Sequence, residues 1–210
     1  MTVEAPAPTR SLGERTFRIL RLTWVPLVAS LTSLVLSISS IVISTRDPAV
    51  TILLPDQIRF VQGERIGFAY AYLQPTFVSR GENDRVEVIR DMHLELTPVG
   101  GGETVTFGWD EVGRLTFDPA DQSLTYEYLA DAVPLLIAPD SAENPLSLFQ
   151  GPPGWFLEAG TYRVELVAGR VVASSSLESE FEITLSDADI DFLNGSDGGQ
   201  FLTLPVTAER

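Results

Sequence analysis

Residues 86–97 read VEVIRDMHLELT, and apolar and polar residues alternate along most of this stretch. One side of an extended chain would carry Val86, Val88, Arg90, Met92, Leu94 and Leu96, and the other side Glu87, Ile89, Asp91, His93, Glu95 and Thr97. A period of two is typical of a strand with one face in the core and one in water. The pattern therefore predicts a half-buried β-strand of about 12 residues.

The flanking sequence extends this pattern into many short strands separated by turns. Residues 98–102, PVGGG, predict a turn into a second strand at 104–109, which together form a hairpin. Gly169-Arg170 predicts another tight hairpin, between strands at 161–168 and 171–176. Further strands are expected at 66–73, 124–129, 133–138 and 181–185. These elements predict a mainly β chain with an antiparallel, immunoglobulin-like β-sandwich over residues 47–186.

The segment from Leu157 to Val164, LEAGTYRV, adds a resemblance to this prediction. It resembles the corner between a loop and a strand in bacterial immunoglobulin-like and fibronectin type III-like domains. In those domains a glycine turns the chain and a tyrosine packs at the corner, the roles expected here of Gly160 and Tyr162. The resemblance implies a fold class and no activity.

Residues 24–43, WVPLVASLTSLVLSISSIVI, form the only long apolar run and contain no charged residue. Twenty helical residues span about 30 Å, the thickness of the hydrocarbon core of a bilayer. The run therefore predicts a single transmembrane helix at residues 24–44, a signal-anchor that follows a basic tail at residues 1–23.

The charges before the apolar run predict its orientation in a membrane, and the length of the run bears on whether it is cleaved off as a signal peptide. Arg10, Arg15, Arg18 and Arg21 precede the run, so the positive-inside rule places the N-terminus in the cytoplasm and the β-domain in the periplasm or outside the cell. The alternative is a signal peptide cleaved after the small-x-small sequence at residues 37–39. The continuation of the run through Ile43 favours an uncleaved anchor in the cell membrane.

Serines recur within the apolar run at intervals of three and four residues. The positions are Ser30, Ser33, Ser37, Ser40 and Ser44, and this spacing places them along one side of a helix. The stripe predicts a helix-packing seam, against a membrane protein or a second copy of the chain. The alternative is that the hydroxyls bond back to carbonyl groups of their own helix.

Composition excludes several classes of function. Residues 1–46 carry a net charge of +3, from five arginines and two acids, and residues 47–210 carry −18, from nine arginines and 27 acids. So acidic a domain repels nucleic acid, which we exclude as a partner. The chain has no cysteine, so disulfides and thiol chemistry are absent. Arginine without lysine indicates a GC-rich, bacterial genome.

The connection at residues 139–159 holds several prolines together with Phe149, Trp155 and Phe156. Aromatic side chains in a rigid loop can form a binding edge, so these three residues are a candidate binding loop. The alternative is that they cover one end of the β-domain core.

An acidic run near the C-terminus contains Asp187, Asp189, Asp191 and Asp197. Calcium prefers carboxylate ligands, so these residues are a candidate weak calcium site. The run lacks the glycine and the glutamate that an EF-hand loop requires at its sixth and twelfth positions. The favoured interpretation is a C-terminal acidic hairpin or tail at residues 187–210, and no cofactor is predicted.

The single histidine, His93, lies between Asp91 and Glu95 on the same face of the predicted strand. Such a row can bind a metal or raise the pKa of the histidine, but more often it is a solvated face. No G-x-S-x-G nucleophile motif and no phosphate-binding glycine loop occur in the sequence.

Three functions remain open at this stage. The sequence favours a non-catalytic interaction or accessory subunit, anchored in the membrane with its β-domain outside the cytoplasm. The first alternative is a surface module that binds a ligand or calcium. The second is a carboxylate-based hydrolase, for which the sequence defines no particular pair of acids.

Overall fold

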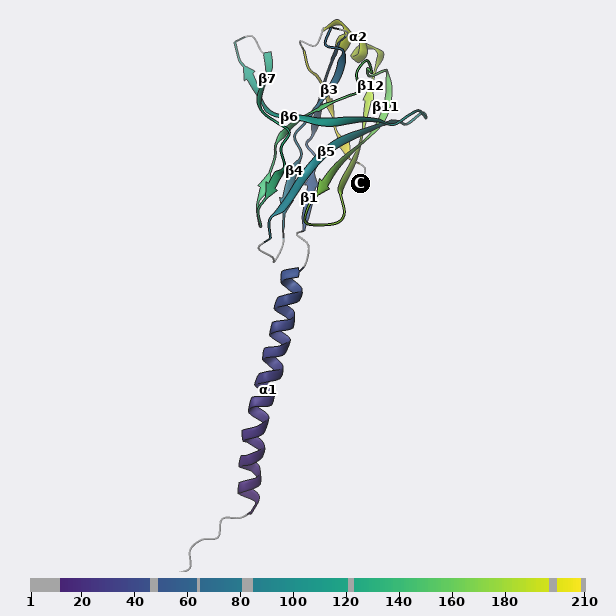
Figure 1. Ribbon diagram of the computed structural model, residues 1–210. Helices are drawn as coiled ribbons and strands as arrows, with labels where there is room; N and C mark the ends of the chain where they lie inside the picture. The colour runs from purple at the N-terminus through teal and green to yellow at the C-terminus, as the bar shows by residue number, and fades with distance from the viewer. Residues whose placement is uncertain are drawn as a thin grey trace, which may run out of the picture. The chain divides into compact units, whose positions relative to one another are not determined.

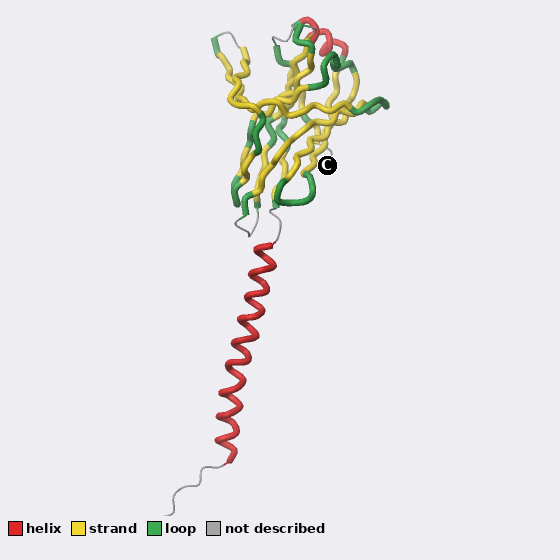
Figure 2. The backbone as a smooth tube through the Cα atoms, viewed as in Figure 1, coloured by secondary structure: helices red, strands yellow, loops and turns green. Residues whose placement is uncertain are grey.

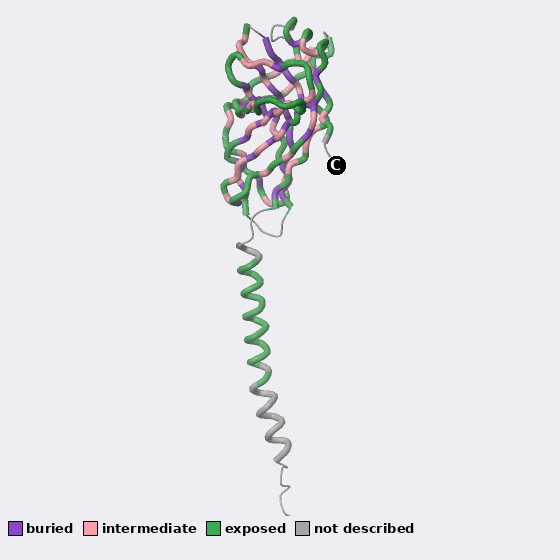
Figure 3. The backbone as a smooth tube through the Cα atoms, turned by 90° about the vertical axis from the view of Figure 1, so that its right-hand side faces the viewer, coloured by how far each residue is buried: buried purple, intermediate pink, exposed green. Residues whose placement is uncertain are grey.

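The computed structural model describes residues 12–45, 49–63, 65–80, 85–120, 123–196 and 200–208. It divides the chain into two compact units, residues 1–46 and residues 47–210. The first unit contains one helix, α1 (Leu12–Thr45). The described side chains of α1, Trp24 and residues 26–42, are all exposed (Figure 3).

The prediction of a transmembrane helix is wrong. No helix in the described part of the chain is both long enough and apolar enough to span a bilayer. The same finding contradicts the prediction of a single-pass membrane protein with a signal-anchor.

The second unit consists mainly of β-strands (Figures 1 and 2). Its elements are β1 (Val50–Leu53), β2 (Gln57–Gly63), β3 (Phe68–Leu73), β4 (Thr76–Ser79), β5 (Glu87–Pro98), β6 (Val105–Asp118), β7 (Ser123–Asp131), β8 (Leu135–Ile137), β9 (Ala142–Glu143), β10 (Leu146–Gln150), β11 (Gly160–Arg170), β12 (Leu177–Leu185), α2 (Asp187–Gly195), β13 (Leu202–Pro205) and β14 (Thr207–Ala208).

The immunoglobulin-like sandwich of two facing sheets is also wrong. Most strands belong to one sheet of 11 strands, in the order β13-β2-β3-β10-β6-β5-β11-β12-β14, with β7 beside β6 and β8 beside β5. A small sheet, β1-β4-β9, accompanies it. Residues 202–208 reach both ends of the long sheet, because β13 pairs with β2 and β14 pairs with β12. The sheet therefore nearly closes on itself.

One apolar core explains this curvature. Phe60 on β2, Phe107 on β6 and Phe181 on β12 come from distant positions in the sheet, yet all are fully buried in the same cluster. The pairing of β6, β10 and β11 contains register shifts, irregularities of the kind that bend strands. A second, smaller cluster on the opposite face centres on Tyr72 and Leu148.

The residues predicted to form a corner do form a local hydrogen-bonded turn. The Tyr162 hydroxyl donates to the Glu158 carbonyl oxygen and accepts from the Glu158 N–H group, at 3.2 Å in each case. The strand order of the domain is not that of the predicted sandwich.

Two local predictions are wrong as well. Residues 171–176 form the connection between β11 and β12 instead of a strand. Residues 187–195 form helix α2, where the first strand of an acidic hairpin was expected. A capping box starts this helix, since the Ser186 hydroxyl accepts from the Asp189 N–H while the Asp189 carboxylate accepts from the Ser186 N–H. Leu193 then fits into the core.

Candidate functional site: the apolar face of the β6–β7 hairpin

The distal half of the β6–β7 hairpin projects from the domain (Figure 1). β5 pairs with β6 only at 105–108, and β10 pairs with β6 only at 108–113. Beyond residue 113, the described neighbour of β6 is β7, whose pairing continues to Asp118 and Ser123. This part of the hairpin is therefore a two-stranded ribbon without the rest of the sheet beside it.

The two faces of this ribbon differ in chemistry. Opposite residues share a face, so the printed register assigns each pair to one side. One face carries the pairs Arg114–Glu127, Thr116–Thr125 and Asp118–Ser123. The other face, called here the hairpin face, carries Leu115, Phe117, Leu124, Tyr126 and Tyr128.

The hairpin face is exposed at Phe117 and Tyr128. Phe117 is 59% exposed and Tyr128 is 53% exposed, while Leu115, Leu124 and Tyr126 are half-buried. An isolated two-stranded ribbon is marginally stable in water, and exposed apolar patches mark interaction sites. The exposed part of the hairpin face is therefore a candidate docking surface.

Aromatic packing fixes the base of the hairpin. The Tyr126 ring lies over Gly113, where a side chain would overlap it. Its centroid is 5.0 Å from that of Tyr72 in an edge-to-face contact, and Tyr72 in turn contacts Phe201 at 5.1 Å. These contacts join the hairpin to the smaller apolar cluster, so the ribbon is held at a defined angle to the sheet.

The hairpin carries more acidic than basic side chains, counted over both of its faces. The acids are Asp110, Glu111, Asp118, Glu127 and Asp131, and Arg114 is the only basic residue on the described part of the hairpin. The Tyr126 hydroxyl lies 3.3 Å from Glu111 Oε2, and the Tyr128 hydroxyl donates to Asp131 Oδ1 at 2.8 Å. Burial and the Glu111 carboxylate raise the pKa of Tyr126, so its hydroxyl stays protonated.

The predicted row Asp91–His93–Glu95 is only partly formed. His93 Nε2 lies 3.4 Å from Glu95 Oε1, but Asp91 pairs with Arg90 at 2.6 Å. Glu165 on β11 stands directly opposite Glu95, and Glu180 on β12 stands directly opposite Glu165. Burial, followed by Glu178, Glu95 and Glu180, raises the pKa of Glu165.

The three residues of the predicted binding loop are placed against the domain. Phe149 belongs to β10 and is fully buried in the main core. Trp155 packs edge-on against Phe107, with ring centroids 5.5 Å apart, and Phe156 is half-buried. These contacts favour the alternative in which the loop covers one end of the core.

The predicted calcium ligands Asp187, Asp189 and Asp191 lie on α2, and Asp197 lies outside the described residues. Asp189 is engaged by Ser186, whose N–H and hydroxyl donate to it at 2.8 and 2.6 Å and lower its pKa. Within the described ranges, no three acidic or histidine side chains are grouped so that they could hold a metal ion.

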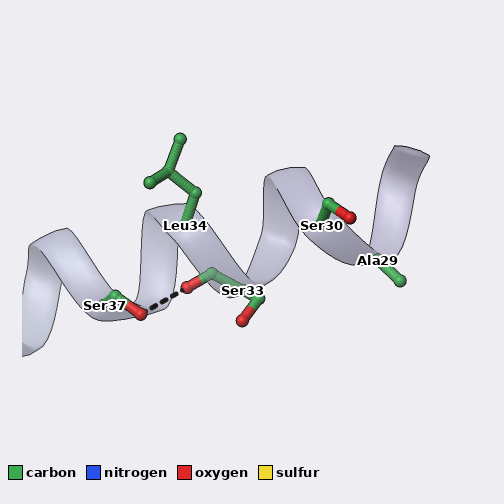
Figure 4. Close-up of a pocket in the computed structure, with 5 residues that line it drawn as sticks. All are labelled: Ala29, Ser30, Ser33, Leu34 and Ser37. Atoms are coloured by element: carbon green, nitrogen blue, oxygen red, sulfur yellow. Dashed lines mark hydrogen bonds between the residues drawn. The ribbon is translucent and has the colours of Figure 1, made fainter. Parts of the chain in front are cut away.

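The serine stripe lies on α1, where Ala29, Ser30, Ser33, Leu34 and Ser37 line one groove (Figure 4). The Ser30 hydroxyl donates to the Pro26 carbonyl oxygen, and the Ser37 hydroxyl donates to the Ser33 carbonyl oxygen, both at 2.8 Å. These bonds favour the alternative in which serines satisfy their own helix. Ser40 is exposed, and the Ser44 side chain lies outside the described part.

Sequence reasoning missed the hairpin face for a physical reason. The strand at 124–129 was expected, but the sequence does not show that its partner β6 continues nine residues beyond Trp109 and leaves the sheet. The sequence does contain a signal for this face. Every second residue is apolar or glycine at Gly113, Leu115 and Phe117, and every second residue is apolar at Leu124, Tyr126 and Tyr128.

No known protein family, curated protein or solved structure matches this chain. The hairpin face is accordingly interpreted from its own geometry.

Proposed function

We propose that this chain is a non-catalytic interaction subunit that binds a partner protein through the hairpin face. The observation that carries the proposal is the uncovered apolar side of the ribbon, centred on Phe117 and Tyr128. Covering these two side chains removes apolar surface from water, which contributes about 25 cal/mol for each Å² buried.

Charge defines the kind of partner. Five acids and one arginine lie on the described part of the hairpin, and the whole domain is acidic. A partner segment that presents leucine or aromatic residues flanked by arginine or lysine complements both features. An acidic partner segment of the same apolar content is repelled, so charge supplies the selectivity.

The proposal has a direct test with synthetic probes. A fluorescent peptide that alternates leucine and arginine is titrated with the full chain, and the binding is followed by anisotropy. The Phe117→Ser and Tyr128→Ser double variant is expected to bind at least tenfold more weakly, because about 1–3 kcal/mol is lost for each buried side chain removed. The matched control is the Thr116→Ser and Thr125→Ser double variant, which changes only the opposite face.

A second probe separates charge from apolarity. A peptide that alternates leucine and glutamate is expected to bind poorly to every variant. The proposal is overturned when the serine variants of Phe117 and Tyr128 bind the arginine peptide as tightly as the parent chain.

A further inference from the structure

β7 has an open edge that is suited to pairing with another strand. Among the described strands with a single neighbour it is the longest, with nine residues. The two ends of the long sheet are formed by the short strands β13 and β14, of four and two residues. β7 contains no proline, and its two charged residues are Glu127, which pairs with Arg114 on β6, and Asp131 at its end.

Symmetry limits the ways in which β7 can pair with a second copy of itself. A two-fold axis perpendicular to the sheet makes the strands antiparallel and places one central residue opposite its own copy. Opposite residues must share a face, so each possible register is defined by the residue that lies on the two-fold axis. The registers that overlap most of β7 are centred on residues 125, 126 and 127.

Charge and length distinguish these three registers. Centring on Glu127 puts two carboxylates directly opposite, which is unfavourable, and runs the pairing across the irregular region near Leu129. Centring on Thr125 uses only residues 123–127 of the described strand. Centring on Tyr126 uses residues 123–129 and puts Glu127 opposite Thr125.

We propose that two copies of this chain pair antiparallel along β7, with Tyr126 at the two-fold axis. Leu124 of each copy then lies opposite Tyr128 of the other, on the same side of the sheet as the hairpin face. Each Glu127 keeps its ion pair with Arg114, which lies 2.7 Å away on its own β6. The Tyr126 ring leans over Gly113 toward β6 and leaves the open edge accessible.

This pairing goes beyond partner binding and does not depend on it. The two ribbons become one four-stranded sheet whose apolar side is twice as wide as that of a single hairpin. Repulsion between two domains of net charge −18 opposes the pairing. Salt screens such repulsion, so pairing is expected to strengthen as ionic strength rises.

Cysteine pairs test the register, because the chain has no cysteine of its own. Four variants of the full chain each carry one cysteine: Thr125→Cys, Glu127→Cys, Leu124→Cys and Tyr128→Cys. Each variant alone, the mixture of the first two and the mixture of the last two are oxidised with copper phenanthroline. Neighbouring cross-strand pairs alternate between wide and close spacing, so one of the two pairs is suited to a disulfide. A disulfide dimer is expected from mixing the first two variants, or the last two, and little from any variant alone. The proposal is overturned when neither mixture forms a dimer, or when a single variant forms more dimer than its mixture.

Charge at Thr125 tests the same contact without a covalent bond. Thr125→Glu places an acid opposite Glu127 of the other copy, and Thr125→Arg places a base there. Two such contacts form in each dimer, so dissociation constants measured by sedimentation are expected to rise with glutamate and fall with arginine, by about twofold to thirtyfold. Any association through α1 is common to both variants and cancels in the comparison. Equal dissociation constants for the two variants would overturn the proposal.

Partner binding is tested separately from dimer formation. If a variant that is monomeric in sedimentation still binds the leucine-arginine peptide, partner binding does not require the dimer.

Discussion

Arg170 Nη2 lies 2.7 Å from Glu87 Oε2, and the two side chains are almost completely buried. The other carboxylate oxygen, Glu87 Oε1, accepts the N–H groups of Val88 and Val172, each at 3.0 Å. One carboxylate thus connects the start of β5 to the chain that leaves β11. All of its lone pairs face donors, which is the condition under which a buried charge is tolerated.

Replacing Glu87 with alanine is expected to destabilise the domain by about 3–5 kcal/mol, because the buried Arg170 would lose its ion pair with the Glu87 carboxylate. The free energy of unfolding from denaturant titration measures this loss at pH 7. Arg163→Ala is the control, since it breaks an exposed pair with Glu180 and is expected to cost at most about 1 kcal/mol. Similar losses in the two variants would contradict the buried-pair interpretation.

Glu87 also predicts a pH dependence. Burial alone raises the pKa of Glu87, but hydrogen bonds from Val172, Val88 and Arg170 outweigh burial and leave the pKa below its ordinary value. The stabilisation is therefore complete above the unfolded-state pKa of about 4.3 and is lost as the pH falls through the lower folded-state value. The difference in unfolding free energy between the parent chain and Glu87→Gln should shrink below about pH 4. A difference that grows with acid would show that the sign is wrong.

Gln62 is the second buried polar junction. Its Oε1 accepts the Leu157 N–H at 2.8 Å, and its Nε2 donates to Asn194 Oδ1 on α2 at 3.1 Å. Gln62→Leu leaves the Leu157 N–H buried without this partner and is expected to cost about 1–3 kcal/mol. Hydrogen exchange of the Leu157 amide should be faster in this variant than in the parent chain. Gln74→Leu is the control, because Gln74 is exposed and bonds only to the Asn144 carbonyl oxygen.

The glutamates facing one another across β5, β11 and β12 predict a stabilising substitution. Glu165 lies between Glu95 and Glu180, and its raised pKa means that the folded domain loses stability as the pH rises through that value. Glu165→Gln is expected to raise the unfolding free energy at pH 7 by about 0.2–1 kcal/mol, with a smaller gain in high salt. The control is Glu182→Gln, because Glu182 stands opposite Arg163. A loss of stability in Glu165→Gln would contradict the repulsion.

Gly113 predicts how the hairpin responds to a single methyl group. Gly113→Ala would overlap the Tyr126 ring, so the ring must move off Tyr72, at a cost of about 1–3 kcal/mol. Near-ultraviolet circular dichroism from the tyrosines should decrease along with stability. Gly108→Ala is the matched control on the same strand, because a side chain there meets no atom within 4 Å. Equal effects of the two alanines would contradict the ring contact.

The existence of several strands, among them β5, was accessible from sequence, but which of their residues are buried was not. β5 occupies Glu87–Pro98, close to the predicted 86–97. The predicted alternation holds from Met92 to Leu96, where Met92, Leu94 and Leu96 are buried, but it reverses before Arg90, where Glu87 and Ile89 are buried instead. The pairing with β11 shifts between Gly169 and Arg170, and this irregularity moves the side chains to the other face.

Of the predicted site residues, those chosen for chemistry were placed in structural roles. Asp189 caps α2, Phe149 fills the core, and Ser30 and Ser37 bond to carbonyl groups of α1. Aspartates are common both at the start of a helix and in loops that bind calcium. The sequence alone therefore does not distinguish these two roles. The proposed interaction surface lies where two strands leave the sheet, a feature that the sequence did not predict.

The sequence by itself determined that residues 47–210 are mainly β and acidic, because alternation and composition are local properties that need no partner strand. The hairpin of β5 and β6 was predicted from the sequence and is confirmed. The tertiary structure alone decided the order of the other strands, that Glu87 meets Arg170 inside the domain, and that the distal β6–β7 ribbon has no other strand beside it. The physical reason is that a period of two fixes which side chains alternate, whereas long-range pairing and bulges fix which face is buried.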